Sequence, residues 1–196
     1  KILPETMQKF FKPFSKSLFN VSKRYISVGE TIPHANLKLV EWKNGEYATS
    51  VLDSHSAFAN QRVILIGFPG AFTPSCENVH LPEYIKRAAE LKADGTDKIF
   101  AMSVNDPFVV GAFAKKLEAG DAITWIADGN GEFTKALDAG VDLSGAALGY
   151  RSRRFTMIIE NKKVVEFNDE KGPQMTDLSR VVSVLSQLGK LKKKKQ

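Results

Sequence analysis

Cysteine and histidine are scarce in this sequence. Among 196 residues there is one cysteine, Cys76, and there are three histidines. A single thiol cannot close a disulfide within its own chain, so a fold stabilised by internal disulfides is excluded. The histidines His34, His55 and His80 lack metal-ligand spacing from one another and from Cys76. We therefore expect no metal site, and no cofactor is predicted.

Long apolar runs and linkers are also missing. No apolar stretch approaches the ~18–20 residues that a helix needs to cross a bilayer, so we expect no membrane span. Internal repeats and low-complexity linkers are absent. The hydrophobic content of 43%, which includes 10% aromatic residues, is sufficient for a core. We expect one domain over residues 26–189, preceded by a basic extension at 1–25 and followed by a lysine-rich tail at 190–196.

The positive charge of the sequence lies at its two ends. The net charge is +6 at pH 7, with +5 on residues 1–24 and another +5 on the last eight residues, which leaves −4 on the body between them. The isoelectric point near 9.3 therefore describes the ends rather than the fold. Because a basic fold surface is not indicated, we expect no nucleic-acid partner.

The first 25 residues have the composition of a targeting segment. They are rich in Lys, Ser and Phe and poor in acidic residues. Phe10, Phe14 and Leu18 recur at four-residue spacing on one possible helical face, as in an organelle transit peptide, although Pro13 opposes a helix there. We predict import into the mitochondrial matrix, with a plastid or the cytoplasm as alternatives. A disordered arm is the other interpretation of this segment.

Strand and helix patterns alternate along the body of the chain. Strands that are separated by helices favour parallel neighbours in one sheet, and hairpins add antiparallel strands. The predicted fold class is α/β, with a central mixed sheet flanked by helices. The expected hairpins lie at 31–39 and 46–52, with Trp42 near the turn, and at 155–160 and 163–167. Further strands are expected at 63–68, 98–104 and 123–127. Helices are expected at 74–93, kinked or split by Pro82, at 108–117, at 131–139, and at 176–188, where Asp177 assists the cap.

The position of Cys76 favours a reactive thiol. The apolar run at 63–68 is typical of a buried strand, and the Pro-Gly pair at 69–70 turns it into a loop. Thr73 is then the predicted N-cap of a helix with Pro74 as its first residue, so Cys76 lies in the first turn. The unpaired N–H groups and the positive end of the helix dipole favour an anion there, and the thiolate is the nucleophilic form. The alternative is a small buried apolar side chain.

The segment Pro-Gly-Ala-Phe-Thr-Pro-Ser-Cys at 69–76 resembles the signature of the type II peroxiredoxins, the peroxiredoxin-5-like group. The resemblance extends over about residues 26–188. It implies a thioredoxin-like fold and a peroxidase that reduces hydrogen peroxide and alkyl hydroperoxides. The other matching segments are His-Leu-Pro at 80–82, Ser-Val-Asn-Asp-Pro-Phe at 103–108, Ala-Asp-Gly-Asn-Gly at 127–131 and Leu-Gly-Tyr-Arg-Ser-Arg-Arg-Phe at 148–155.

The resemblance assigns roles to individual residues. Cys76 is implied to attack the peroxide and become a sulfenic acid. Arg154 is implied to face the thiolate, where a guanidinium supplies a fixed positive charge and directed donors. The Thr73 hydroxyl and the backbone N–H of Cys76 are implied to join Arg154 around the peroxide oxygens. Pro69 and Pro74 are implied to shape the loop and limit water.

Two neighbouring features have a second interpretation. A second interpretation of Arg151, Arg153 and Arg154 is a solvated run of charges before a strand. If Arg151 faces solvent, its replacement by alanine should change the rate of peroxide reduction little. His80 lies four residues after Cys76, so a thiolate–imidazolium pair is conceivable on a continuous helix. A packing or interface role for His80 is favoured.

The sequence departs from its relatives in lacking a second cysteine. Many type II peroxiredoxins carry one at positions that correspond to 101–102 or 175–176, and neither exists here. A one-cysteine cycle is therefore implied, with glutathione and glutaredoxin, or thioredoxin, as the reductant. The resemblance also implies a homodimer through surfaces around the active-site loop. Two alternatives remain: a peroxide-sensing redox relay protein that forms mixed disulfides with a partner, and a binding module with an inert Cys76.

Overall fold

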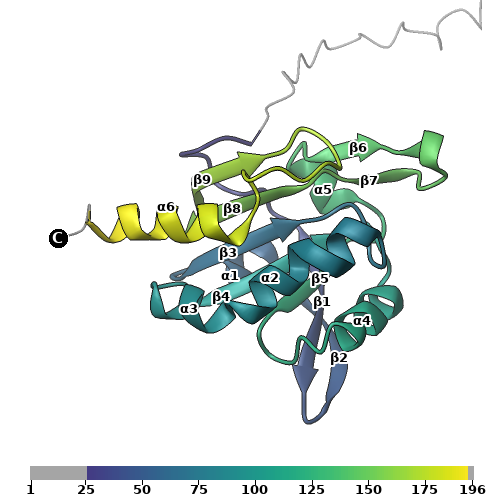
Figure 1. Ribbon diagram of the computed structural model, residues 1–196, viewed down its shortest axis with the longest axis horizontal. Helices are drawn as coiled ribbons and strands as arrows, with labels where there is room; N and C mark the ends of the chain where they lie inside the picture. Colours follow the sequence, from purple (N-terminus) through teal and green to yellow (C-terminus); the bar gives the residue numbers. More distant parts are fainter. Residues whose placement is uncertain (1–25, 194–196) are drawn as a thin grey trace, which may run out of the picture.

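The computed structural model of the chain describes residues 26–193, and a seven-stranded mixed sheet with helices on both faces lies at its centre (Figure 1). The strands of this sheet are β1 (Asn36–Lys43), β2 (Glu46–Asp53), β3 (Arg62–Gly67), β4 (Lys98–Ser103), β5 (Thr124–Ala127), β8 (Phe155–Glu160) and β9 (Lys163–Asp169). They lie in the order β2-β1-β5-β4-β3-β8-β9. The three central strands β5, β4 and β3 are parallel, whereas both outer pairs run antiparallel. The predicted fold class is confirmed.

Strand β3 is buried on both faces of the sheet. Ile64 and Ile66 pack into one apolar cluster, and Val63 and Leu65 pack into another on the opposite face, as the two-residue period of a strand requires. The first cluster is covered by α2 (Leu81–Lys86), α3 (Ala88–Ala93), α4 (Pro107–Lys116) and α6 (Val181–Lys193). The second cluster is covered by α1 (Ser54–Ala57) and α5 (Glu132–Ala136). In residues 26–193, no helix has both the length and the apolar character of a membrane span.

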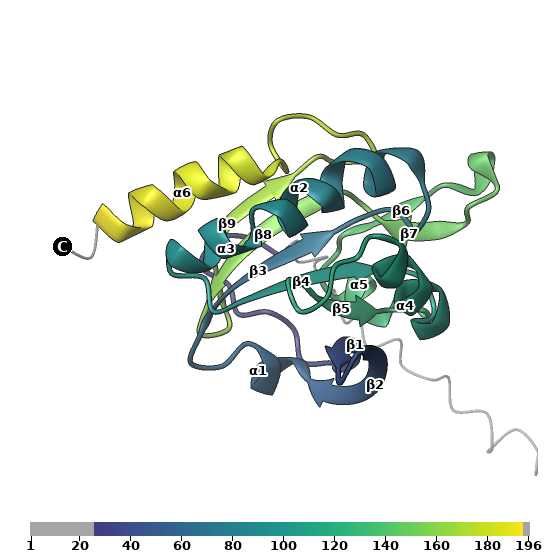
Figure 2. The ribbon, with the colours of Figure 1, turned by 60° about the horizontal axis from the view of Figure 1, so that its bottom comes forward.

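A small second sheet was not predicted. Strands β6 (Gly140–Asp142) and β7 (Tyr150–Ser152) pair antiparallel around a short 3₁₀ turn, Ser144–Ala146. Three-residue strands are too short to produce a recognisable alternation in the sequence. In both ribbon views this hairpin and helix α6 extend from opposite sides of the molecule (Figure 1, Figure 2).

The first predicted hairpin begins later than expected. Its first strand was predicted at 31–39, but β1 runs from Asn36 to Lys43 and includes Trp42, which pairs with Tyr47 beside the turn. The preceding residues pair elsewhere: Ile32 N donates to Lys162 O at 2.9 Å, at the turn between β8 and β9. The periodicity of an extended segment does not indicate which neighbour it joins.

The predicted helices at 131–139 and 176–188 are also placed incorrectly. α5 ends at Ala136, and Asp138 adopts a left-handed conformation with φ 47°. α6 begins only at Val181 and continues to Lys193, so Asp177 does not cap it as predicted. Thr176 and Ser179 instead donate hydrogen bonds to the Glu170 carboxylate. Those bonds give Thr176 and Ser179 partners outside a helix.

Candidate active site

The loop after β3 is anchored by close backbone contacts. Gly67 ends the strand against the Phe155 ring, whose Cε1 atom lies 2.1 Å from the point where a Cβ would stand. Any larger residue would therefore displace that ring. Beyond the strand, Phe68 N still donates to Met102 O at 3.0 Å, and Ala71 N donates to Asn105 Oδ1 at 3.0 Å. The neighbouring strand and its following loop thus fix the path of the chain that leads to Cys76.

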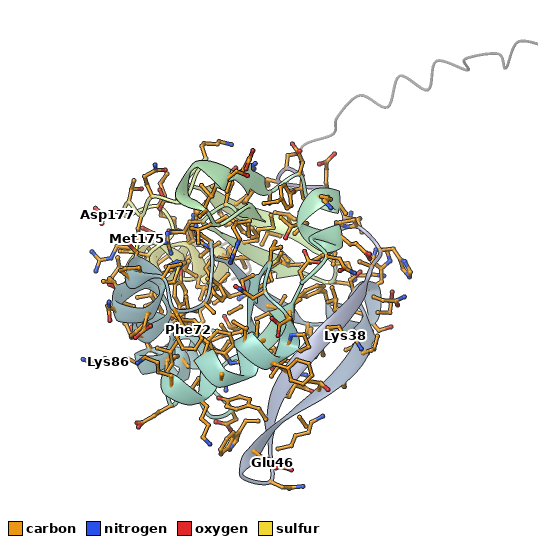
Figure 3. The ribbon with its side chains drawn as sticks, turned by 90° about the vertical axis from the view of Figure 1, so that its right-hand side faces the viewer. Lys38, Glu46, Phe72, Lys86, Met175 and Asp177 are labelled. Carbon is orange, nitrogen blue, oxygen red and sulfur yellow. The ribbon has the colours of Figure 1, made fainter. Side chains whose placement is uncertain are left out.

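Phe72 stands out in this loop because it has a left-handed backbone with φ 60°. A bulky residue rarely adopts that conformation, which costs of order 1–3 kcal/mol. Its ring packs edge-on against Phe113 of α4 at 5.2 Å between centroids, and 46% of the residue remains exposed. In the view of Figure 3, Phe72 lies in the same half of the molecule as Met175 and opposite Lys38.

The helix that carries the thiol begins at Pro74, as predicted. Thr73 occupies the N-cap position through its carbonyl, which accepts from Glu77 N at 2.9 Å. Its hydroxyl does not cap the helix, because it donates back to Gly70 O at 2.9 Å. Cys76 lies in the first turn and is fully buried, Pro74 is exposed, and Pro69 is buried.

The predicted continuous helix at 74–93 is interrupted twice. Residues Cys76–His80 form a wide π-helical turn, in which Leu81 N donates to Cys76 O. Pro82, which has no N–H, is the second residue after this turn, so the irregularity predicted at the proline lies just before it. The second interruption falls at Arg87, which separates α2 from α3 and which the sequence pattern did not indicate.

Arg154 meets the thiol inside the protein. Only 1% of the residue is exposed, and its Nη2 atom lies 3.4 Å from Cys76 Sγ. The guanidinium also donates to the carbonyl oxygens of Pro173 and Gln174 and to His80 Nδ1, at 3.2–3.3 Å and 2.9 Å respectively. None of these partners is an anion. A buried cation without a carboxylate is costly. The geometry therefore directs the positive charge of Arg154 at the Cys76 sulfur.

His80 is a neutral partner of the guanidinium. Because Nδ1 accepts from Arg154, the ring hydrogen lies on Nε2, which faces Ser179 O at 3.1 Å. Burial and the Arg154 charge lower the pKa of His80 from 6.5 to about 3. The ring also meets Tyr84 edge-on at 5.6 Å. This arrangement favours the packing role over a thiolate–imidazolium pair, which the contacts of His80 do not include.

The protonation of His80 should weaken the fold in mild acid. In the unfolded chain a histidine binds a proton near pH 6.5, whereas the folded chain holds this pKa near 3. The contribution of His80 to the free energy of unfolding should be complete above about pH 7. Between pH 6.5 and the folded pKa it should fall by about 1.4 kcal/mol per pH unit. Urea unfolding of the parent and of His80→Gln at several pH values measures the difference in slope.

The parent protein is the reference, and the profile of His80→Gln should be flatter than that of the parent in acid. Equal slopes for the parent and His80→Gln would show that the folded protein accepts a proton on this ring without loss of stability.

The other two arginines of the cluster have different partners. Arg153 donates to both carboxylate oxygens of Asp169, at 3.1 and 2.8 Å. Arg151 is half-buried and donates to Leu148 O at 2.8 Å and to Asn105 Oδ1 at 3.4 Å. The interpretation of the cluster as a solvated run, with Arg151 facing solvent, is therefore wrong.

Sequence reasoning missed two supports of the site. Asn105 lies in the segment 103–108, which the resemblance included, but a side-chain contact across two loops has no signal in a single sequence. The segment 172–179, whose carbonyls receive Arg154, was assigned in part to a helix. Its run of Gly172 and Pro173 was the available signal for a loop.

The chain is similar to several known proteins. The Redoxin family model matches residues 27–185. Peroxiredoxin-2C of Oryza sativa subsp. japonica is 44% identical over 151 residues, which cover 77% of this chain and 91% of that protein. Reduced Prx3 of Vibrio vulnificus in complex with hydrogen peroxide has a TM-score of 0.75 and 38% identity, over 84% of this chain and 96% of that one.

A protein named as a 1-Cys peroxiredoxin is also among the similar structures. The Plasmodium falciparum antioxidant protein, a 1-Cys peroxiredoxin, has a TM-score of 0.74 and 29% identity, over 83% of this chain and 99% of that one. Similar proteins include some named as mitochondrial and others named as chloroplastic. With its thioredoxin-like fold, its thiol–arginine pair and these relatives, the chain belongs to the Redoxin family and is a type II, peroxiredoxin-5-like peroxiredoxin, a thiol-dependent peroxidase with a single cysteine.

Proposed function

We propose that this enzyme reduces hydrogen peroxide and alkyl hydroperoxides through a sulfenic acid on Cys76, which an external thiol then resolves. The observation that carries the proposal is the contact of 3.4 Å between Arg154 Nη2 and Cys76 Sγ. The guanidinium has no carboxylate among its partners in residues 26–193. Its charge is therefore available to the sulfur and to a bound peroxide.

In the first step the thiolate sulfur attacks the nearer peroxide oxygen. A sulfur–oxygen bond forms, the oxygen–oxygen bond breaks, and the electron pair leaves on the distal oxygen, which takes a proton to become water or an alcohol. Sulfur is oxidised and the peroxide is reduced. Donors that already point at the leaving oxygen stabilise its growing charge. We assign this role to Arg154 and to the backbone N–H of Cys76.

Thr73 has a conditional place in this step. At rest its hydroxyl hydrogen is directed to Gly70 O at 2.9 Å. To donate to a peroxide oxygen, the hydroxyl has to turn away from that carbonyl; without turning, it can only accept. Pro69 and Pro74 are proposed to hold the loop and limit water around the reacting atoms.

The second half of the cycle needs a thiol from outside, because the chain has no second cysteine. Glutathione sulfur attacks the sulfenic acid, a sulfur–sulfur bond forms and water leaves. Glutaredoxin then removes the glutathione by thiol–disulfide exchange and returns the Cys76 thiol. Thioredoxin is the alternative donor, and it would attack the sulfenic acid or a disulfide between two chains directly.

Intact mass identifies the donor. Peroxide followed by glutathione should add one glutathione to the protein, and glutaredoxin should remove it and sustain peroxide consumption. Peroxide alone should give monomers on a non-reducing gel apart from slow cross-links between two Cys76 residues, and excess peroxide should give the sulfinic acid. If no glutathione adduct forms and only thioredoxin sustains peroxide consumption, the glutathione route is wrong. The assignment as a peroxidase would still hold.

The peroxide-consumption assay also separates the peroxidase from the relay protein and from the inert binding module. Sustained consumption indicates an enzyme, a single equivalent indicates a relay protein, and no consumption indicates an inert module. A homodimer stays a prediction, which the exposed aromatic residues Phe72 and Phe108, at 46% and 84%, support. Import into the mitochondrial matrix, or into a plastid, also stays a prediction, because residues 1–25 lie outside the described residues.

A further inference from the structure

The segment that connects β9 to α6 supplies the surroundings of Arg154. We call residues 172–179 the strap. Gly172 O accepts from Arg154 N at 2.8 Å, and Pro173 O and Gln174 O accept from the guanidinium. At its other end, Ser179 O faces the Nε2 atom of His80, the ring that accepts from Arg154. The direction of the guanidinium therefore depends on where the strap lies.

The carboxylate of Glu170 holds the strap. Its Oε1 accepts from the backbone N–H groups of Thr176 and Ser179, each at 3.0 Å, and from the Ser179 hydroxyl at 2.7 Å. Its Oε2 accepts from the Thr176 hydroxyl at 2.6 Å. Glu170 N also donates to Arg154 O at 3.0 Å. Four bonds to one carboxylate fix two positions of the strap at once, and bonds to a charged acceptor are stronger than neutral ones.

The carboxylate is ionised in this arrangement. Partial burial acts to raise the pKa of Glu170, but the hydrogen bonds from Thr176 and Ser179 outweigh it and lower the pKa on balance. Glu170 does not reach the thiol itself: the groups that bind its oxygens belong to the strap. It also does not cap α6, which begins two residues after Ser179. Its four bonds are thus directed to a segment whose carbonyl oxygens in turn contact Arg154, His80 and Tyr84.

We propose that Glu170 is a positioning residue for the thiol, acting through the strap to keep the Arg154 guanidinium against Cys76 Sγ. The inference rests on the proposed function for its role in peroxide reduction. A small displacement of an aimed charged group strongly affects a reaction, and about 1 Å costs on the order of a hundredfold in rate. A loosened strap should therefore lower the thiolate fraction of Cys76 and the rate of peroxide reduction while the protein remains folded.

Glu170→Gln tests this inference. An amide has one oxygen and an NH₂ group that cannot accept, so part of the four-bond set is lost without loss of volume. The thiolate fraction near neutral pH, measured by ultraviolet absorbance across a pH titration of the resting protein, should fall. Peroxide reduction should slow by about tenfold. Glu166→Gln is the matched control. It removes the same charge from a residue of β9, whose carboxylate accepts a hydrogen bond from Gln187 at 3.4 Å.

A double substitution separates positioning from general stability. If Glu170 acts through Arg154, then adding Glu170→Gln to Arg154→Ala should leave the thiolate titration unchanged, because the group being positioned is gone. A lower melting temperature for Glu170→Gln with the parent's titration would overturn the proposal. Equal effects of Glu170→Gln in both backgrounds would also overturn it.

Ser179→Ala covers the case in which Glu170→Gln does not fold. It removes one hydroxyl bond at 2.7 Å and retains the backbone bond at 3.0 Å. A smaller shift of the thiolate titration in the same direction is expected, and an unchanged titration would contradict the proposal. Because the titration needs no turnover, a shift in a protein that fails to consume peroxide would support the positioning role and refute the proposed function.

Discussion

A Cys76→Ser protein is expected to lose peroxide reduction and keep its fold. The serine hydroxyl is nearly the same size as the thiol and can occupy the same buried position beside Arg154. It is not ionised near neutral pH, however, and oxygen in this position cannot take up the peroxide oxygen as sulfur does. Peroxide consumption with the glutathione–glutaredoxin system measures the loss, and circular dichroism with a melting curve checks the fold.

The chain offers no second thiol that would confuse this experiment. Residual turnover within about tenfold of the parent would mean that Cys76 is not the nucleophile. If Cys76→Ser instead loses activity and also melts at a lower temperature, the main role of the thiol is its packing in the fold, as expected of a structural cysteine. In that case Cys76→Ala distinguishes a loss of stability caused by a cavity from one caused by the lost hydrogen bond with Arg154.

Removal of the guanidinium should produce the second large effect. Arg154→Ala is expected to slow peroxide reduction by about a hundredfold or more, because loss of one aimed donor at a site of this kind costs ~3 kcal/mol. The thiolate fraction should fall in the same variant, since its nearest positive charge is gone. Stopped-flow measurement of kcat/KM and a thiolate titration check the two effects separately.

Arg153→Ala is the appropriate control for charge. It removes a cation one residue away, whose partner is Asp169 rather than the thiol. Arg154→Lys retains the charge and loses the forked geometry, so it should recover part of the thiolate fraction and little of the rate. Equal rate losses in Arg153→Ala and Arg154→Ala would show that the arginines act as a diffuse field.

The chemistry of the site was more predictable from the sequence than its support. The segment 69–76 indicated the loop, the helix start and the thiol, because each depends on residues that are adjacent in the chain. The choice of Arg154 among three arginines came from the resemblance, and the structure places its side chain against the thiol. Asn105 and Glu170 act through contacts between distant loops, which local propensity does not encode.

The fold shows the same division. The strands at 63–68 and 98–104 were predicted to within two residues, because buried parallel strands carry long apolar runs. The helix predicted from Thr176 failed because the Glu170 carboxylate binds Thr176 and Ser179 in a non-helical conformation. A tertiary hydrogen-bond network overrode the weak helix propensity of that segment.

The complete burial of Cys76 has a kinetic consequence for the regeneration of the thiol. Cys76 has no exposed surface, so neither a hydroperoxide nor a larger donor thiol touches it in this conformation. Both half-reactions therefore require the site to open, and an opening of the loop at Phe72 would exchange its packing on Phe113 for relief of its left-handed backbone. Two donors of unequal chemical reactivity would then meet the same ceiling, which is set by how often the loop opens and not by the donor.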